Sequence, residues 1–157
     1  MTKTNAMRQL DKAKISYEPK FYQVDESDLS GMHIVSQIKM NPAQVFKTLV
    51  ARGDKHGPCV FCIPVCCEVD LKKAALAAGE KRVELVPVKE LLTLTGYLRG
   101  GCSPIGMKKK YPTYLDQSAF HFPQITISAG MRGCQLALDP HDLCRFTNAI
   151  LCHIAAK

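Results

Sequence analysis

A lysine stands inside a strand-like segment of the sequence that is otherwise apolar. In VFKTLV, residues 45–50, alternate positions fall on opposite faces, and both faces are largely apolar. Because lysine is rarely buried without a partner, Lys47 should either reach a cleft or have a lowered pKa. In a cleft its ammonium could bind a phosphate, contact the α-amino region of a bound amino acid, or stabilise charge during a reaction. The alternative is a lysine near a strand end whose ammonium extends to solvent.

Two segments with glycines could present backbone N–H groups to a ligand. The first, TGYLRGGCSPIG at residues 95–106, contains the consecutive Gly100 and Gly101, which allow the backbone to approach a ligand closely. It matches neither GxxxxGK[ST] nor GxGxxG. The second, SAGMRG at residues 128–133, could offer Ser128 and N–H groups to an oxyanion or a carbonyl. From the patterns alone, an ordinary connection and an ordinary hairpin turn are the alternatives.

Lys108, Lys109 and Lys110 directly follow the first glycine segment, and a cationic run beside a pocket suits a phosphate backbone. We therefore expect these lysines to bind a nucleic acid. The 157 residues carry 21 Lys and Arg against 14 Asp and Glu, a formal net charge of +7, which favours a polyanionic partner. A solvated charge run, and a net charge that serves solubility alone, are the competing interpretations.

Motifs of several common hydrolases are absent from the sequence. It contains no GxSxG, no HExxH and no pair of carboxylates at a suggestive spacing, and its five histidines fall in different segments. A hydrolase with this sequence would therefore need an unconventional way to activate its nucleophile.

Eight cysteines raise the question of a metal site or of disulfides. Cys59 and Cys62 belong to an apolar strand, where positions three apart point to opposite faces and cannot chelate one ion together. Cys144 and Cys152 lie eight residues apart on an expected helix. A structural zinc site would need a second pair of cysteines with ligand spacing, and the sequence offers none. We expect no metal, no cofactor and no disulfide, with most cysteines acting as small apolar residues. A metal- or redox-active cysteine protein is the alternative.

The elements that would position these residues are short. We expect helices at about 5–14, 32–40, 70–79, 87–95 and 141–154, and strands at about 15–24, 45–51, 58–65, 83–86, 113–115, 124–128 and 134–138. Hairpin-type loops at 53–58 and 129–133 would join neighbouring strands. This mixture predicts a single α/β or α+β domain spanning residues 1–157. With no run of 18 apolar residues and a charged N-terminal segment, we expect a cytoplasmic protein without a membrane span.

Six sequence blocks occur in an informative order. They are FKTLV at 46–50, DLKKAA at 70–75, TGYLRGGCSPIGMKKK at 95–110, PTYLDQSA at 112–119, ISAGMRG at 127–133 and LDPHDL at 138–143. In order and spacing they resemble the YbaK-type Cys-tRNA(Pro)/Cys-tRNA(Cys) deacylases, relatives of the editing domain of bacterial prolyl-tRNA synthetases. The resemblance covers nearly the whole chain. It implies a compact, highly mixed β-sheet, partly barrel-like, with flanking helices.

The resemblance also implies a function: trans-editing hydrolysis of the aminoacyl ester of mischarged tRNA. The substrate would be chiefly Cys-tRNA(Pro), with Cys-tRNA(Cys) as a second one and prolyl-tRNA synthetase as a further partner. Catalytic roles would fall on Lys47, Gly101 and Ser128, and substrate binding on Tyr22, Thr48, Gly100, Cys102, Ala129 and Gly130. In this family the thiol of the cysteine substrate attacks its own ester, which agrees with the missing protein nucleophile.

Two departures from the family pattern concern the pocket. Ser30-Gly31 stands where a bulky residue is common, and Cys102 stands where an aliphatic residue is usual. Both bear on the amino-acid preference more than on the reaction class. A deacylase for another small amino acid such as alanine, and a non-catalytic tRNA- or synthetase-binding module of the same fold, are the alternatives.

Overall fold

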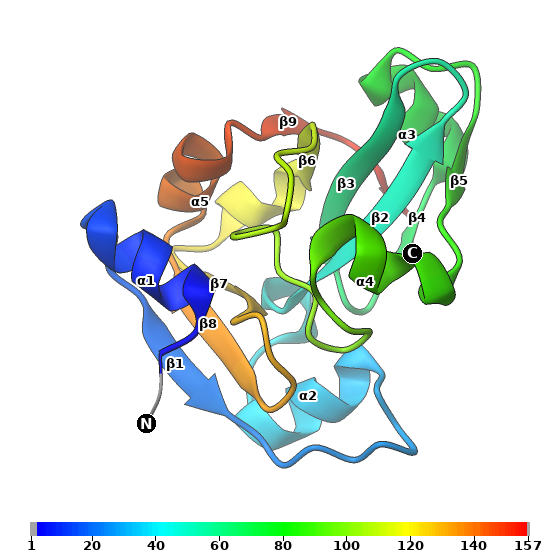
Figure 1. The fold of residues 1–157 in the computed structure, drawn as a ribbon. Helices are drawn as coiled ribbons and strands as arrows, with labels where there is room; N and C mark the ends of the chain where they lie inside the picture. The colour runs from blue at the N-terminus through cyan, green and yellow to red at the C-terminus, as the bar shows by residue number, and fades with distance from the viewer. Residues whose placement is uncertain (1–2, 157) are drawn as a thin grey trace.

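The computed structural model describes residues 3–156, which form short helices and strands (Figure 1). The helices are α1 (Asn5–Lys12), α2 (Gly31–Ile38), α3 (Leu71–Ala78), α4 (Val88–Thr95) and α5 (Pro140–Thr147), with 3-10 turns η1 (Pro42–Gln44) and η2 (Gln117–His121). The strands are β1 (Glu18–Phe21), β2 (Phe46–Gly53), β3 (Gly57–Pro64), β4 (Glu68–Val69), β5 (Val83–Leu85), β6 (Thr113–Asp116), β7 (Ile125–Ser128), β8 (Cys134–Leu138), β9 (Ile150–Cys152) and β10 (Ala155–Ala156).

The strands belong to three sheets with both parallel and antiparallel pairing. A five-stranded sheet has the order β5-β2-β3-β6-β9, a three-stranded sheet the order β1-β8-β7, and β10 pairs with β4 alone. β3 is central and antiparallel to β2 but parallel to β6, as expected for a strand with two apolar faces. The mixed α+β class is therefore confirmed.

The expectation of a partly barrel-like sheet is wrong. The two larger sheets are joined by a single bridge between Val45 and Thr126, and each sheet keeps its own edge strands. A barrel needs a hydrogen-bonded ladder that continues around to the first strand. One bridge does not supply it, so the sheets stay open.

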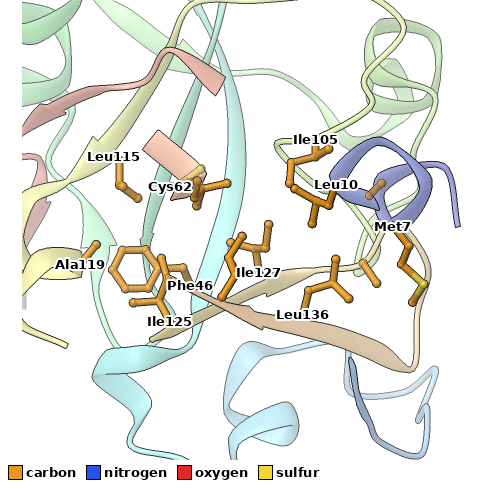
Figure 2. Close-up of a cluster of buried hydrophobic side chains, with 14 of the residues drawn as sticks. Met7, Leu10, Phe46, Cys62, Ile105, Leu115, Ala119, Ile125, Ile127 and Leu136 are labelled. Atoms are coloured by element: carbon orange, nitrogen blue, oxygen red, sulfur yellow. The ribbon is translucent and has the colours of Figure 1, made fainter. Parts of the chain in front are cut away.

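The core has two main apolar clusters, one on each face of β3. Phe46, Cys62 and Leu115 belong to the larger cluster, which also holds side chains of α1 and β8 (Figure 2). Cys59 and Phe61 belong to the other, against α3. Cys59 and Cys62 thus point to opposite faces, as the alternation predicted.

Local signals set the helix ends. Thr4, Asp70 and Asp139 cap α1, α3 and α5, each accepting a backbone N–H with its side chain. Gly79 ends α3 in the left-handed conformation, φ +70°. These caps confirm the expected beginnings of the three helices.

The expected extent of the last helix is wrong. α5 ends at Thr147, Asn148 adopts a left-handed conformation with φ 57°, and the chain then pairs with β6 as β9. Cys152 therefore lies on a strand rather than on the same helix as Cys144. The cause is long-range: the buried Asp116 carboxylate accepts the N–H groups of Ile154 and Ala155, both at 3.0 Å. Strand β1 is also shorter than expected, and β4 and β10 were not predicted.

No helix within residues 3–156 is long and apolar enough to cross a membrane.

Candidate active site

A cavity of about 340 Å³ opens beside β2, between α2 and the segment that follows α4. Five of the residues singled out in the sequence line it: Lys47, Thr48, Gly100, Cys102 and Ser128. They come from three stretches of chain that are far apart in the sequence. Strand β2 supplies the first two, the glycine segment the next two, and the end of β7 supplies Ser128.

Lys47 carries the one charge that β2 directs to this cavity. It pairs across the sheet with Ile63 of β3, and its side chain is half-buried. Among residues 3–156, no carboxylate lies within 4.0 Å of its ammonium. Its charge is therefore available to an anion or to a polarised ester inside the cavity.

One cysteine lines the cavity and a second lies behind its lining. Cys62 lies beneath Thr48, whose Oγ1 is 3.9 Å from Cys62 Sγ, and Cys102 lines the cavity directly. Burial raises the pKa of Cys62 to about 12 and that of Cys102 to about 12. Both are neutral thiols at neutral pH, and neither is a ready thiolate nucleophile.

The two glycine segments pack against each other and close another side of the cavity. A Cβ at Gly101 would lie 3.1 Å from the backbone nitrogen of Arg132. The Arg132 Nε donates to the carbonyl oxygen of Arg99 at 2.8 Å. Gly130, with φ +96°, lies under the ring of Tyr97, so a Cβ there would be 3.0 Å from Tyr97 Cε1. Glycine is needed at both places because the segments approach so closely.

Backbone N–H groups near the cavity differ in whether they are free to donate. Gly101 donates to Leu98 O at 3.0 Å, and Ala129 donates to Cys134 O at 3.1 Å. Gly130 donates to Ser128 Oγ at 3.1 Å, which fixes the turn. Within the described chain, the N–H groups of Gly100 and Cys102 have no acceptor. Unlike the N–H of Gly101, these two N–H groups are not committed to an acceptor within the described residues.

The remaining residues of the predicted site lie around the cavity rather than in its lining. Ala129 is fully buried in the larger core cluster. Tyr22 lines an adjoining crevice, where its ring meets His33 edge-on at 6.4 Å between centroids. That crevice shares Leu29, Ser30, Ile34 and Gly100 with the cavity.

The predicted lysine run is split by the structure. Lys109 and Lys110 line a different cavity, whereas the Lys108 side chain lies against Gly96. The backbone N–H of Lys108 donates to Thr95 O at 3.0 Å, which turns this residue toward the end of α4.

Of the wall formed around α2, sequence reasoning named only Ser30-Gly31, which do line the cavity; it missed the other apolar residues of this wall and two polar residues. Leu29, Met32, Ile34, Val65, Arg99 and Gln135 all line the cavity. Gln135 had a visible signal, since it interrupts the apolar strand CQLAL, and its Oε1 accepts from Thr126 Oγ1 at 3.1 Å. The other residues of the α2 wall had none, because their position depends on tertiary packing. Gly31 is essential there: a Cβ would lie 2.4 Å from Val65 Cβ.

The described residues include no group of three His, Cys, Asp or Glu side chains placed to hold a metal ion. All eight cysteines are free thiols.

Comparisons with known proteins identify the family. The family described as the aminoacyl-tRNA editing domain matches residues 33–146. A protein of Enterococcus faecalis (strain ATCC 700802 / V583), assigned by name as a Cys-tRNA(Pro)/Cys-tRNA(Cys) deacylase, EbsC, is 44% identical over 155 residues. That match covers 99% of this chain and 94% of the relative.

Solved structures share the fold at low sequence identity. One, described as a trans-editing enzyme for prolyl tRNA synthetase, has a TM-score of 0.81 at 22% identity and covers 97% of this chain and 93% of its own. Another, the hypothetical protein APE2540, has a TM-score of 0.86 at 17% identity, and the match covers 95% of this chain and 97% of that one. From the family match and the extent of the 44% identity, this chain belongs to the aminoacyl-tRNA editing domain family.

Proposed function

We propose that this protein is a trans-editing deacylase that hydrolyses the aminoacyl ester of mischarged tRNA, chiefly Cys-tRNA(Pro) and also Cys-tRNA(Cys). The observation that carries the proposal is Lys47, without an ion pair among the described residues, in a cavity also lined by Gly100 and Cys102, whose N–H groups have no acceptor there. The 44% identity to a relative named as such a deacylase supports the substrate class.

The cavity suits an aminoacyl group and part of the terminal ribose. Its volume of about 340 Å³ is at the lower end of small-molecule sites, which favours small side chains such as that of cysteine. Ser30 and Gly31, small residues at its α2 wall, and Cys102 in the glycine segment shape the space available to that side chain. We assign the amino-acid preference to these three positions.

The proposed chemistry uses the thiol of the substrate as nucleophile. The sulfur attacks the ester carbonyl, a carbon–sulfur bond forms, and the carbon–oxygen bond to the ribose breaks. The thiol proton passes to the departing ribose oxygen, and water then hydrolyses the cyclic thioester. An intramolecular nucleophile has a high effective molarity, so the protein needs only to orient the ester.

The protein groups then have separate roles. Negative charge develops on the carbonyl oxygen during attack, and the N–H groups of Gly100 and Cys102 would donate to it. Lys47 would add a positive charge within the same cavity. Ser128 would hold the turn through its bond with the Gly130 N–H and direct its own hydroxyl toward the substrate. Gly101 and Gly130 would allow the two glycine segments to meet.

The tRNA would be held by its phosphates. The net charge of +7 would supply long-range attraction, and Lys109 and Lys110, which line a cavity, would contact the phosphate backbone. Selection of tRNA(Pro) would come from prolyl-tRNA synthetase as a partner. We place the protein in the cytoplasm, where tRNA is charged.

A turnover assay tests the function directly. The purified protein is incubated with Cys-tRNA(Pro) and with correctly charged Pro-tRNA(Pro). We expect rapid release of cysteine and stability of the prolyl ester. Absence of turnover on every mischarged tRNA would instead support a binding module with an inactive pocket.

A further inference from the structure

A second cavity, of about 240 Å³, lies outside the site described above. Its walls come from α1, α5 and the segment that leads from α4 to β6. Two of its lining residues, Lys109 and Lys110, are cationic, and two, Tyr111 and Phe146, are aromatic. The proposed chemistry uses none of its residues.

The lining combines the two features that recognise a nucleotide. The side chains of Lys109 and Lys110 are exposed, and within the described chain neither forms an ion pair. Tyr111 is half-buried, and its hydroxyl donates to Leu94 O at 2.7 Å, which fixes the ring. Ammonium groups bind phosphate, and fixed aromatic rings stack on bases.

The two cavities lie on either side of a very short piece of chain. Cys102 lines the first cavity and Pro104 lines the second. Two residues of extended chain span at most about 7 Å. In Figure 1 the segment from α4 to β6 crosses the molecule with α1 and α5 on one side and α4 and β2 on the other. Lining residues of the two cavities therefore lie close together, as a single strand of RNA that occupies both would require.

We propose that the second cavity binds a nucleotide of the single-stranded 3′ end of the tRNA, next to the terminal adenosine. Lys109 and Lys110 contact its phosphate, and its base lies against Tyr111 and Phe146. This inference rests on the proposed function, because the terminal aminoacyl group must occupy the Lys47 cavity. The second cavity then positions the 3′ end of the tRNA and takes no part in the hydrolysis.

The sequence offers a matched control. Lys108 is adjacent to the two lysines and equally exposed, but it lies against Gly96 instead of lining the cavity. Lys72 is exposed on α3 and is absent from the cavity lining. The double variants Lys109→Gln/Lys110→Gln and Lys72→Gln/Lys108→Gln therefore remove the same charge from different places.

The binding experiment uses deacylated tRNA(Pro), either intact or lacking its last three nucleotides, at several salt concentrations. With intact tRNA, Lys109→Gln/Lys110→Gln should bind more weakly, and its plot of log K against log salt should be about 1.5 units flatter than that of the wild type. The affinity of the control variant Lys72→Gln/Lys108→Gln should fall less. With truncated tRNA, the wild type and Lys109→Gln/Lys110→Gln should have the same affinity and the same salt dependence. The proposal would be overturned if Lys109→Gln/Lys110→Gln lost as much affinity for truncated tRNA as for intact tRNA. It would also be overturned if the control variant lost as much affinity for intact tRNA as Lys109→Gln/Lys110→Gln does.

A second measurement uses the trinucleotide CCA as the probe. In NMR titrations of the wild type, CCA should shift the amide signals of Thr113 and Thr147, which line the cavity, and these shifts should be lost in Lys109→Gln/Lys110→Gln. Deacylation of Cys-tRNA(Pro) is measured on the same samples. Turnover without these shifts would refute the nucleotide subsite and leave the proposed function standing. Shifts without turnover would support the subsite and refute the proposed function.

Discussion

Replacement of Lys47 by methionine should remove most of the deacylase activity and leave the fold intact. Methionine keeps an unbranched apolar stem in the half-buried position on β2 but lacks the ammonium. Loss of one positioned charge or donor from a developing oxyanion costs about 3 kcal/mol, so kcat should fall about 100-fold or more. Lys47→Ala should behave in the same way.

The expected effect on stability is small. Within residues 3–156, no ion pair is lost with Lys47, and the side chain is only half-buried. The free energy of unfolding should therefore change by about 0.5 kcal/mol or less. Thermal unfolding of the variant checks this before any activity is interpreted.

The assay is single-turnover deacylation of labelled Cys-tRNA(Pro) with enzyme in excess, repeated over a range of enzyme concentrations. Lys47→Arg serves as the variant that retains the charge. A fall in the saturated rate would show that Lys47 stabilises the transition state. Weaker binding with an unchanged saturated rate would show that it binds a phosphate instead. A folded Lys47→Met protein with the saturated rate and the binding affinity of the wild type would refute the role of this lysine.

Three further predictions follow from the same structure. Ser-tRNA(Pro) should react much more slowly than Cys-tRNA(Pro), because a hydroxyl is the weaker nucleophile at neutral pH; equal single-turnover rates would exclude attack by the thiol. Gly101→Ala would push its Cβ against the backbone of Arg132, 3.1 Å away, and should slow deacylation about tenfold, whereas wild-type rates would show that the two glycine segments need not meet. Asp116→Ala should lower the free energy of unfolding by about 2–4 kcal/mol, because buried donors of residues 154–155 lose their acceptor. Burial alone would raise the pKa of Asp116, but hydrogen bonds from Ser118 and from the backbone of residues 154–155 outweigh it and lower the pKa. The stability from the carboxylate should thus be complete above about pH 5 and be lost as pH falls through the lowered pKa; a variant whose acid denaturation matches the wild type would contradict this.

Much of the local structure was predictable because its causes are local. Thr4, Asp70 and Asp139 could be read as helix caps because a side-chain oxygen next to an unpaired N–H needs no distant partner. Residues 58–65 are apolar on both faces, which likewise predicted a central strand, and the alternation of strand side chains placed Cys59 and Cys62 on opposite faces. Lys47 in an apolar strand indicated a lysine that could reach a cleft, and it lines the cavity beside β2.

Tertiary structure decided what depends on distant segments. The chain after Asn148 forms strands because β6 and the Asp116 carboxylate offer partners nearly 40 residues away in sequence, which outweigh the local preference for helix. The α2 wall of the cavity, the occupied N–H of Gly101 and the separation of Lys108 from Lys109 also follow from packing between segments. The sequence by itself determined which residues were chemically suited to the site; contacts between segments far apart in the chain determined which of them meet, because spacing along a chain does not set distance in space.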